Sequence, residues 1–372
     1  MGASNTVLRT RCVYGCATGG PGCALGEGIE GWLTKEVYQA LEAQDMGKLQ
    51  DLACSAPMVK ERAFLFPGEE CPMTVLALAL QRRDVRAVRA LLDAGTSPNL
   101  PISPEQRSVY AHRSQMAALN GGDPDLQNLV PGTHFEALCA KQHKELFMLL
   151  LDKSANPNSG IIQVSHCGDL EMLEALLSRG AEPNLWQRGS TPLLMSVKSR
   201  TEPHEKVTAL LRSSADPNYT GLALAATPSG PSPSAPRVGR TVYPALTTAT
   251  RKRDYRMVRI LLEAGADVNQ VAGDEGLPNA LFWATYWGEL ELVRLFISLS
   301  KHRLDLSIRK YTNETVLDVA NTSQTFAAMR KPKHIAKLPL PNRPAAVYEQ
   351  IAKMLEEYRA QYPEAGGSVV AA

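Results

Sequence analysis

Hydrophobic residues recur along this chain at the spacing i, i+1, i+4, i+5, which places them on one face of an α-helix. Five stretches share the spacing: Ala87/Val88/Leu91/Leu92, Leu146/Phe147/Leu150/Leu151, Met172/Leu173/Leu176/Leu177, Met257/Val258/Leu261/Leu262 and Leu292/Val293/Phe296/Ile297. The pattern predicts a series of amphipathic helices, each of which packs against both of its neighbours.

The same sequence pattern occurs five times along the chain: a helical stretch, then a short turn, then an asparagine. The closing residues are Asn99, Asn158, Asn184, Asn218 and Asn269, and the intervals between them are 59, 26, 34 and 51 residues. A unit of about 33 residues, with insertions and one deletion, accounts for all four intervals. The chain is therefore predicted to be a repeat protein.

A repeat of this length, with these residues in register, resembles the ankyrin-repeat family. Thr191-Pro192-Leu193-Leu194 and Thr74-Val75-Leu76-Ala77 match the start of the first helix, and Gly168-Asp169 and Gly288-Glu289 match the turn between helices. The histidine of the family's helix start is missing from every copy, and the glycine after the second helix is replaced by Ser154 and Ser214. The resemblance covers residues 34–360 and implies the fold but no particular partner.

The predicted fold is an all-α repeat solenoid of about six to eight helix-turn-helix units including caps. Residues 1–33 are expected to form a flexible Gly/Cys-rich segment, residues 34–360 the repeats, and residues 361–372 a disordered tail. Insertions are expected at about 100–132, 219–243 and 321–344, the first with a short helix at 104–119. Residues 34–54 and the helix 345–358 would be the terminal caps.

Composition is that of a protein with a large buried core, since 44% of the 372 residues are hydrophobic and 21% are charged. The net charge of +2 neither demands nor excludes a nucleic-acid partner. No stretch reaches the ~18 apolar residues of a membrane span. Seven cysteines without metal-ligand spacing favour reduced thiols and a cytoplasmic location.

The first residues, Met1-Gly2-Ala3-Ser4-Asn5-Thr6, fit the N-myristoylation pattern, in which Gly2 is acylated. Cys12, Cys16 and Cys23 would then carry palmitate as the second anchor that stable membrane association needs. The same segment also fits a plain flexible tail. Because it has no acidic residue before Glu27, organelle import stays open as a third interpretation.

A catalytic constellation is absent from the sequence pattern, so we expect no enzyme activity, no cofactor and no metal site. Gly15, Gly19, Gly20 and Gly22 are not followed by Gly-Lys-Ser/Thr, as a phosphate loop would be. His166 and Cys167 are adjacent on a predicted helix, where neighbouring side chains point apart. Cys12, Cys16 and Cys23 lack a fourth ligand for zinc.

Partner binding is the function that the resemblance implies, because ankyrin repeats bind through residues just before the turn between helices. The candidate residues here are Arg82, Lys141, Lys198, Arg251, Lys252, Tyr286 and Trp287. The basic residues predict attraction to an acidic or phosphorylated protein, and exposed Tyr and Trp are common interface anchors. The alternative is that the basic residues are merely solvated and the two aromatics pack on the next repeat. Trp283 is expected in the core.

The leading hypothesis is a non-catalytic adaptor or assembly subunit that holds another protein by its concave face and hairpin insertions. A lipid-anchored membrane-surface tether is the second hypothesis. The third is a single-stranded nucleic-acid binder that stacks bases on Tyr286 and Trp287, for which the composition gives less support.

Overall fold

The computed structural model describes residues 25–119, 130–139, 143–187, 189–220, 243–271, 279–300, 304–308, 314–328 and 343–363. These residues form helix pairs and one two-stranded antiparallel sheet. None of the described helices is both long and apolar enough to cross a membrane. The chain divides into two compact units, residues 1–180 and 181–372, which are described separately.

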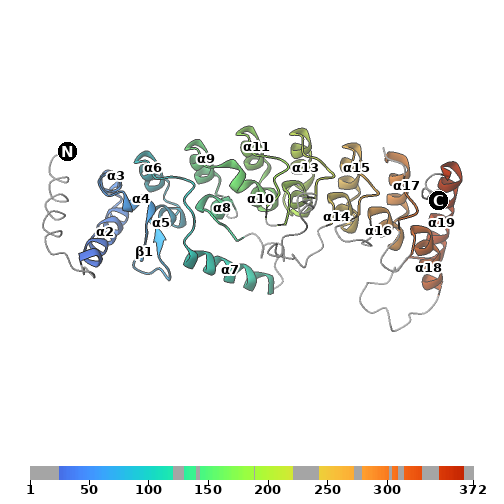
Figure 1. The fold of residues 1–372 in the computed structure, drawn as a ribbon, viewed down its shortest axis with the longest axis horizontal. Coiled ribbons are helices and arrows are strands. Elements are labelled where there is room, and N and C mark those ends of the chain that lie inside the picture. The colour runs from blue at the N-terminus through green and yellow to red at the C-terminus, as the bar shows by residue number, and fades with distance from the viewer. Residues whose placement is uncertain are drawn as a thin grey trace, which may run out of the picture. The chain divides into compact units, whose positions relative to one another are not determined.

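The first unit begins with helix α2 and packs its later helices in pairs (Figure 1). Helices α3, α6, α9 and α11 contact one another in that order, and α8 contacts α10. The elements are α2 (Leu25–Glu42), α3 (Met46–Ser55), α4 (Met58–Glu61), β1 (Ala63–Phe64), β2 (Met73–Thr74), α5 (Val75–Gln81), α6 (Val85–Asp93), α7 (Pro104–Leu119), α8 (His134–Cys139), α9 (Lys144–Asp152), α10 (Pro157–Cys167) and α11 (Leu170–Ser178).

The second unit repeats the same arrangement. The first helices of its pairs, α12, α14, α16 and α18, contact one another in sequence order, as do the second helices α13, α15 and α17, while α19 packs on α17 and α18. The bounds are α12 (Pro192–Lys198), α13 (Pro203–Arg212), α14 (Ala245–Arg251), α15 (Tyr255–Glu263), α16 (Ala280–Tyr286), α17 (Leu290–Leu299), α18 (Val316–Ala328) and α19 (Ala345–Gln361).

Side-chain caps fix where the helices begin. Thr74 and Thr191, which the sequence places at the start of first helices, accept hydrogen bonds from the backbone N–H groups of Ala77 and Leu194, both at 3.1 Å. Asp84 and Asp254 cap the second helices α6 and α15 in the same way. These caps satisfy donors that the first helical turn leaves unpaired.

The closing asparagines connect successive repeats within each unit. The side-chain oxygens of Asn99, Asn184, Asn218 and Asn269 accept hydrogen bonds of 2.7–2.8 Å from backbone N–H groups in the next repeat's turn. Three of the amides also donate to a carbonyl two residues earlier in that turn. The sequence-predicted ankyrin-type repeat fold is therefore confirmed, and these asparagines are structural.

One repeat lacks this turn. Helix α10 begins at Pro157, directly after its N-cap Asn156, so Asn158 lies in the first helical turn. The deletion expected from the 26-residue interval is thus present as predicted.

Two expected boundaries need correction. Helix α2 begins at Leu25, so residues 25–33 are helical and not part of a flexible segment. Leu33 is buried and lies one helical turn before buried Val37, which extends the apolar face of the terminal helix backward. Helix α18 continues to Ala328, so residues 321–328 of the expected third insertion are helical as well.

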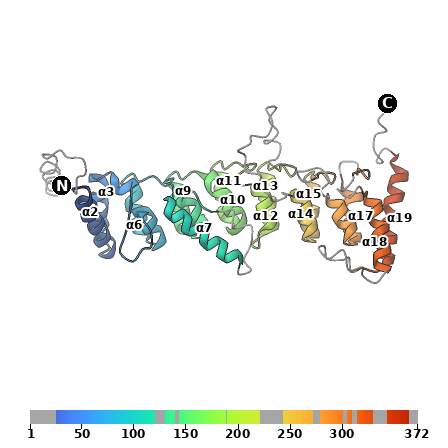
Figure 2. The same ribbon diagram turned by 60° about the horizontal axis from the view of Figure 1, so that its bottom comes forward.

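The first insertion contains helix α7 over the predicted residues, and α7 lies beside the helix pairs of its unit (Figures 1 and 2). Its base is closed by a bridge between Pro101 and Thr133 and by a 2.9 Å hydrogen bond from the N–H of Ile102 to the carbonyl of Gly132. The Ser103 hydroxyl donates to the carbonyl of Pro72 at 3.1 Å, which ties α7 to the strand β2 segment.

Candidate partner-binding surface

The predicted binding residues lie at the ends of first helices. Arg82 follows α5 in the first unit, whereas Lys198, Arg251 and Tyr286 end α12, α14 and α16 in the second unit. Lys252 and Trp287 are the next residues after α14 and α16. Lys141, Gly2, Cys12, Cys16 and Cys23 lie outside the described residues.

Arg82 is already engaged within the chain. Its guanidinium pairs with the carboxylate of Glu42 at 2.7 Å and lies over the ring of Tyr38, 5.0 Å from the centroid. Because a carboxylate already neutralises this guanidinium and an aromatic ring covers one of its faces, it attracts an anionic partner less strongly. Arg82 is therefore mainly a contact between α5 and α2.

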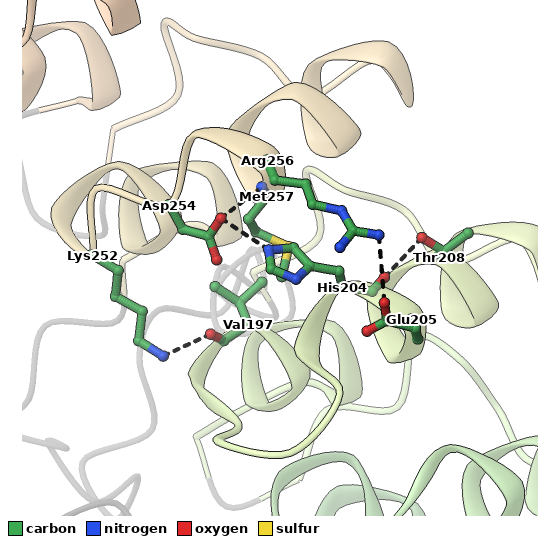
Figure 3. A network of polar contacts seen from close by, with 8 residues as sticks. All are labelled: Val197, His204, Glu205, Thr208, Lys252, Asp254, Arg256 and Met257. Atoms are coloured by element: carbon green, nitrogen blue, oxygen red, sulfur yellow. Dashed lines mark hydrogen bonds and ion pairs between the residues drawn. The ribbon is translucent and has the colours of Figure 1, made fainter.

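Lys252 has a structural contact too. Its ammonium donates a 2.8 Å hydrogen bond to the carbonyl of Val197, next to the end of α12 (Figure 3). A cation at this place satisfies a helix carbonyl and interacts favourably with the helix dipole. Lys252 thereby joins the first helices of two successive repeats.

The neighbouring second helices are joined by a histidine–carboxylate pair (Figure 3). The Asp254 carboxylate lies 2.9 Å from Nε2 of His204 and accepts the backbone N–H of Met257 at 3.0 Å. Burial acts to raise the pKa of Asp254, but these hydrogen bonds and the charges of His204 and Lys252 outweigh it, so the pKa lies below its usual value.

This pair has the composition of part of a catalytic triad, but among the described residues no hydroxyl or thiol is hydrogen-bonded to the ring of His204. The nearby Thr208 hydroxyl donates to the backbone carbonyl of His204 at 2.8 Å and not to its ring (Figure 3). Glu205 and Arg256 flank the pair as an ion pair of 3.4 Å. The geometry is that of a helix-to-helix joint.

His166 and Cys167, the adjacent pair noted in the sequence, lie in the first unit. Both residues are at the end of α10, with His166 buried and Cys167 half-buried. Within the part of the chain that the structure describes, no group of three or more His, Cys, Asp or Glu residues could hold a metal ion.

Arg251 lies against two aromatic rings from different parts of the sequence. Its guanidinium carbon is 4.4 Å from the centroid of the Tyr243 ring and 5.2 Å from that of Trp283. Arg253 lies in the same way over Trp287, at 5.3 Å. We call Tyr243, Arg251, Arg253, Trp283, Tyr286 and Trp287 the arginine–aromatic surface.

Trp283 is the centre of this surface and is buried, as the sequence predicts. The centroids of Trp283 and Trp287 are 4.9 Å apart, and Tyr286 meets Trp283 edge-on at 6.0 Å. Tyr286 and Trp287 are half-buried. The two aromatics thus pack largely on their own repeat and expose only part of each ring.

A buried carboxylate supports the surface from one side. Glu289 follows Gly288 in the turn after α16, and its side chain is only 2% exposed. It pairs with Arg253 at 3.2 Å and with Arg343 at 3.1 Å, and it accepts the Tyr255 hydroxyl at 2.5 Å. Burial and the bond to Glu289 raise the pKa of Tyr255 to about 12. Arg253 is thereby fixed in position over Trp287.

Arg251 differs from the other basic residues at this surface because no described residue accepts a hydrogen bond from its guanidinium. A planar guanidinium that rests on aromatic rings keeps its N–H groups in one plane. That geometry matches the two oxygens of a carboxylate or phosphate. The surface can therefore receive an anionic group without first rearranging Arg251.

Sequence reasoning identified Arg251, Tyr286 and Trp287 but missed Tyr243 and Glu289. Tyr243 is far from Trp283 along the chain, and only the packing of α14 on α16 brings them to the same cation. Glu289 looks like an ordinary turn residue in the sequence. Its burial and its two arginine partners become visible only in the fold.

Among known proteins, similarity to this chain was found in solved structures. No protein-family model matches the chain, and no curated protein does. The ankyrin repeat domain of Bcl-3, described as a unique member of the IkappaB protein family, is similar to the chain with a TM-score of 0.41 and 21% sequence identity. The match covers 66% of this chain and 92% of that one. A similarity of this size does not bear on what the present chain binds.

Proposed function

We propose that the chain is a non-catalytic protein-interaction module that captures an acidic or phosphorylated segment of a partner protein on the arginine–aromatic surface. The observation that carries the proposal is the guanidinium of Arg251, held over Tyr243 and Trp283 with no described acceptor. Little side-chain entropy is left to lose when such a group binds an anion, which favours binding.

The rings beside Arg251 extend the proposed contact. Tyr and Trp provide apolar area at low entropy cost, and interfaces rich in them together with Arg contain a disproportionate share of binding energy. The half-buried edges of Tyr286 and Trp287 would contact the residues that flank the anionic group. Lys198, at the end of α12, lies in the preceding repeat of the same unit.

A peptide array tests this proposal. The full chain is probed against matched peptides that contain glutamate, phosphoserine, phosphotyrosine or the neutral parent residue. We expect retention of the anionic peptides, about tenfold weaker retention by Arg251→Ala, and an intermediate effect of Arg251→Lys, which keeps the charge but loses the planar fork. Binding should also weaken with added salt.

Arg259→Ala is the matched control, because Arg259 is an exposed arginine on α15 of the same unit, outside the surface. Equal losses for the Arg251 and Arg259 variants would mean that only the net charge matters and would reject the proposed site. Tighter retention of a single-stranded oligonucleotide than of any anionic peptide would favour the nucleic-acid hypothesis instead.

The lipid-anchor hypothesis rests on Gly2, Cys12 and Cys16, which the structure does not describe. It stays a prediction and concerns where the module acts and not what it binds. The intact mass of the native protein would show an acyl chain on Gly2 or its absence.

A further inference from the structure

The arginine–aromatic surface continues past Trp287 to a second cationic group. Arg253 and Arg343 both pair with Glu289, and their guanidiniums approach the same carboxylate oxygen, Oε1, at 3.2 and 3.1 Å. Arg253 comes from the turn before α15 and Arg343 from the segment before α19, and all three residues belong to the second unit. We call Arg253 and Arg343 the arginine pair.

The arginine pair has more positive charge than Glu289 neutralises. One carboxylate balances one guanidinium, and among the described residues no second acid pairs with either arginine. Tyr255, which also binds Glu289, stays neutral, because burial and that hydrogen bond raise its pKa to about 12. Two guanidiniums that meet at one oxygen repel each other, so the pair attracts a further anion.

The unused N–H groups of the arginine pair are accessible. Glu289 is buried beneath the pair, whereas the side chains of Arg253 and Arg343 are 52% and 48% exposed. Arg253 contacts Glu289 through Nε, so both of its Nη groups, the end-on fork of the guanidinium, are without an acceptor among the described residues. Arg343 contacts Glu289 through Nη2 alone. Arg82 differs, because it pairs one Nη group of its fork with a carboxylate of its own, Glu42.

Arg251 and the arginine pair lie over rings that contact each other. Arg251 rests on Trp283 and Arg253 on Trp287, and the centroids of these two rings are 4.9 Å apart. An extended polypeptide spans about 3.3 Å per residue. One short segment of a partner can therefore reach both cationic groups.

We infer that this surface binds a partner segment with two anionic groups, the first at Arg251 and the second, a phosphorylated residue, at the arginine pair. A phosphate monoester has three acceptor oxygens and nearly two negative charges, so it can bridge Arg253 and Arg343 while each arginine keeps its contact with Glu289. The place of the first group rests on the proposed function, whereas the arginine pair can be tested without it.

A spacing scan tests the two-group requirement. Peptides of alanine and glycine carry either one phosphoserine or two, with one to six residues between the two, and their affinity for the full chain is measured by calorimetry. We expect the best doubly phosphorylated peptide to bind about tenfold or more tightly than the singly phosphorylated one. One spacing should be preferred, because the two groups on the protein are a fixed distance apart. Equal affinity at every spacing would mean that only peptide charge matters and would overturn the inference.

Variants of Arg343 separate the second group from the first. Arg343→Ala leaves Arg253 and Glu289 as a one-to-one pair, so the best doubly phosphorylated peptide should bind only as tightly as the singly phosphorylated one, whose own affinity stays the same. Arg343→Lys keeps the charge beside Glu289 but loses the planar fork, and should retain part of the gain. Arg294→Ala, at an exposed arginine of α17 paired with Glu291, is the matched control and should behave as wild type. A full gain in Arg343→Ala would overturn the inference.

The arginine pair is tested alone in the full chain with Arg251→Ala, labelled with 5-fluorotryptophan. Because Arg253 lies over Trp287, phenyl phosphate at the pair should shift the ¹⁹F signal of Trp287, which is assigned by its loss in Trp287→Phe. The shift should be saturable and should vanish when Arg343→Ala is added. If this shift is present but wild type and Arg251→Ala bind every peptide equally, the proposed function fails and the phosphate site at the pair stands. Absence of the shift overturns the inference even where Arg251 binds peptides.

Discussion

At the scale of single residues, the most informative side chain is one that the repeat pattern did not reveal. The sequence lacks the histidine of the family's helix start, yet His134 opens α8 one residue after the capping Thr133. Its Nε2 lies 3.0 Å from the hydroxyl of Thr74 in the preceding repeat. His134 thus links two first helices from the buried side.

Because His134 is buried, we expect the free energy of unfolding to fall in mild acid. Burial lowers the pKa of His134 from 6.5 to about 4. Its contribution to the free energy of unfolding is therefore fully present above pH 6.5 and is lost as the pH falls from 6.5 toward 4. The loss amounts to roughly 3 kcal/mol. Urea unfolding of wild type and His134→Gln between pH 7.5 and 4 measures it, and the variant, which keeps a polar partner for Thr74, should show a flatter profile.

The exposed His112 on α7 serves as the matched control, and His112→Gln should retain the pH profile of the wild type. If His134→Gln loses stability in acid as steeply as the wild type does, then His134 is not the group that titrates.

Two serines take a backbone conformation that suits glycine. Ser154 and Ser214 have φ of 66°, at the positions where Gly95, Gly180 and Gly265 end other second helices. The left-handed region strains a residue with a Cβ atom by ~1–2 kcal/mol, whereas glycine adopts it freely. Glycine also increases the conformational entropy of the unfolded chain, which offsets part of this gain. We therefore expect Ser154→Gly and Ser214→Gly each to raise the free energy of unfolding by a net amount of about 0.5–1 kcal/mol.

The same substitution at Ser178, the last residue of α11, should have the opposite sign, because glycine in a helix costs about 0.5–1 kcal/mol relative to ordinary residues. Thermal unfolding of the three single variants compares them. A destabilising effect of glycine at positions 154 and 214 would show that the serine side chains themselves stabilise these turns.

At the scale of elements, α19 packs on the last helices of the second unit, α17 and α18. Tyr348 of this helix is buried and donates its hydroxyl to the carbonyl of Tyr286 at 3.2 Å. Arg343, just before the helix, pairs with Glu289. A Cβ atom on Gly288 would approach Arg343 and Tyr348 to 3.0 Å, so the absent side chain at this turn allows the close contact.

Glu289 is expected to hold α19 in place. Glu289→Ala removes the buried partner of Arg253, Arg343 and Tyr255, and should lower the free energy of unfolding by about 2–3 kcal/mol, since both arginines remain half-exposed and can be solvated. Hydrogen-exchange mass spectrometry should show faster exchange in α19. Glu291→Ala, an exposed acid paired with Arg294, is the control and should cost less than about 1 kcal/mol. Unchanged protection of α19 would contradict this assignment.

The insertions show how far an element can be predicted from its own sequence. The helix α7 lies at the bounds expected from the sequence, residues 104–119. The contacts that hold α7 were not predicted, because Ser103 and Pro72 lie on separate segments that meet only after the base of the insertion is closed.

At the scale of the whole molecule, the net charge of +2 does not reveal how charge is distributed. The second unit contains the arginine–aromatic surface, where two arginines lie over aromatic rings beside the buried carboxylate of Glu289. Repeat proteins distribute stability over nearest-neighbour contacts, so each surface rests on the helix pairs around it. Substitutions in the second unit should therefore act on this surface more strongly than substitutions in the first unit.

The sequence by itself determined the repeat, its helix pairs, its caps and its asparagine turns, because each follows from residues within one unit of about 33. It also placed Arg251, Tyr286 and Trp287 at helix ends. Only the tertiary structure decided which charges are already paired, such as Arg82 and Lys252, and which guanidinium rests on aromatic rings with no acceptor among the described residues. Those outcomes depend on contacts between residues far apart in the chain, and local patterns hold no information about them.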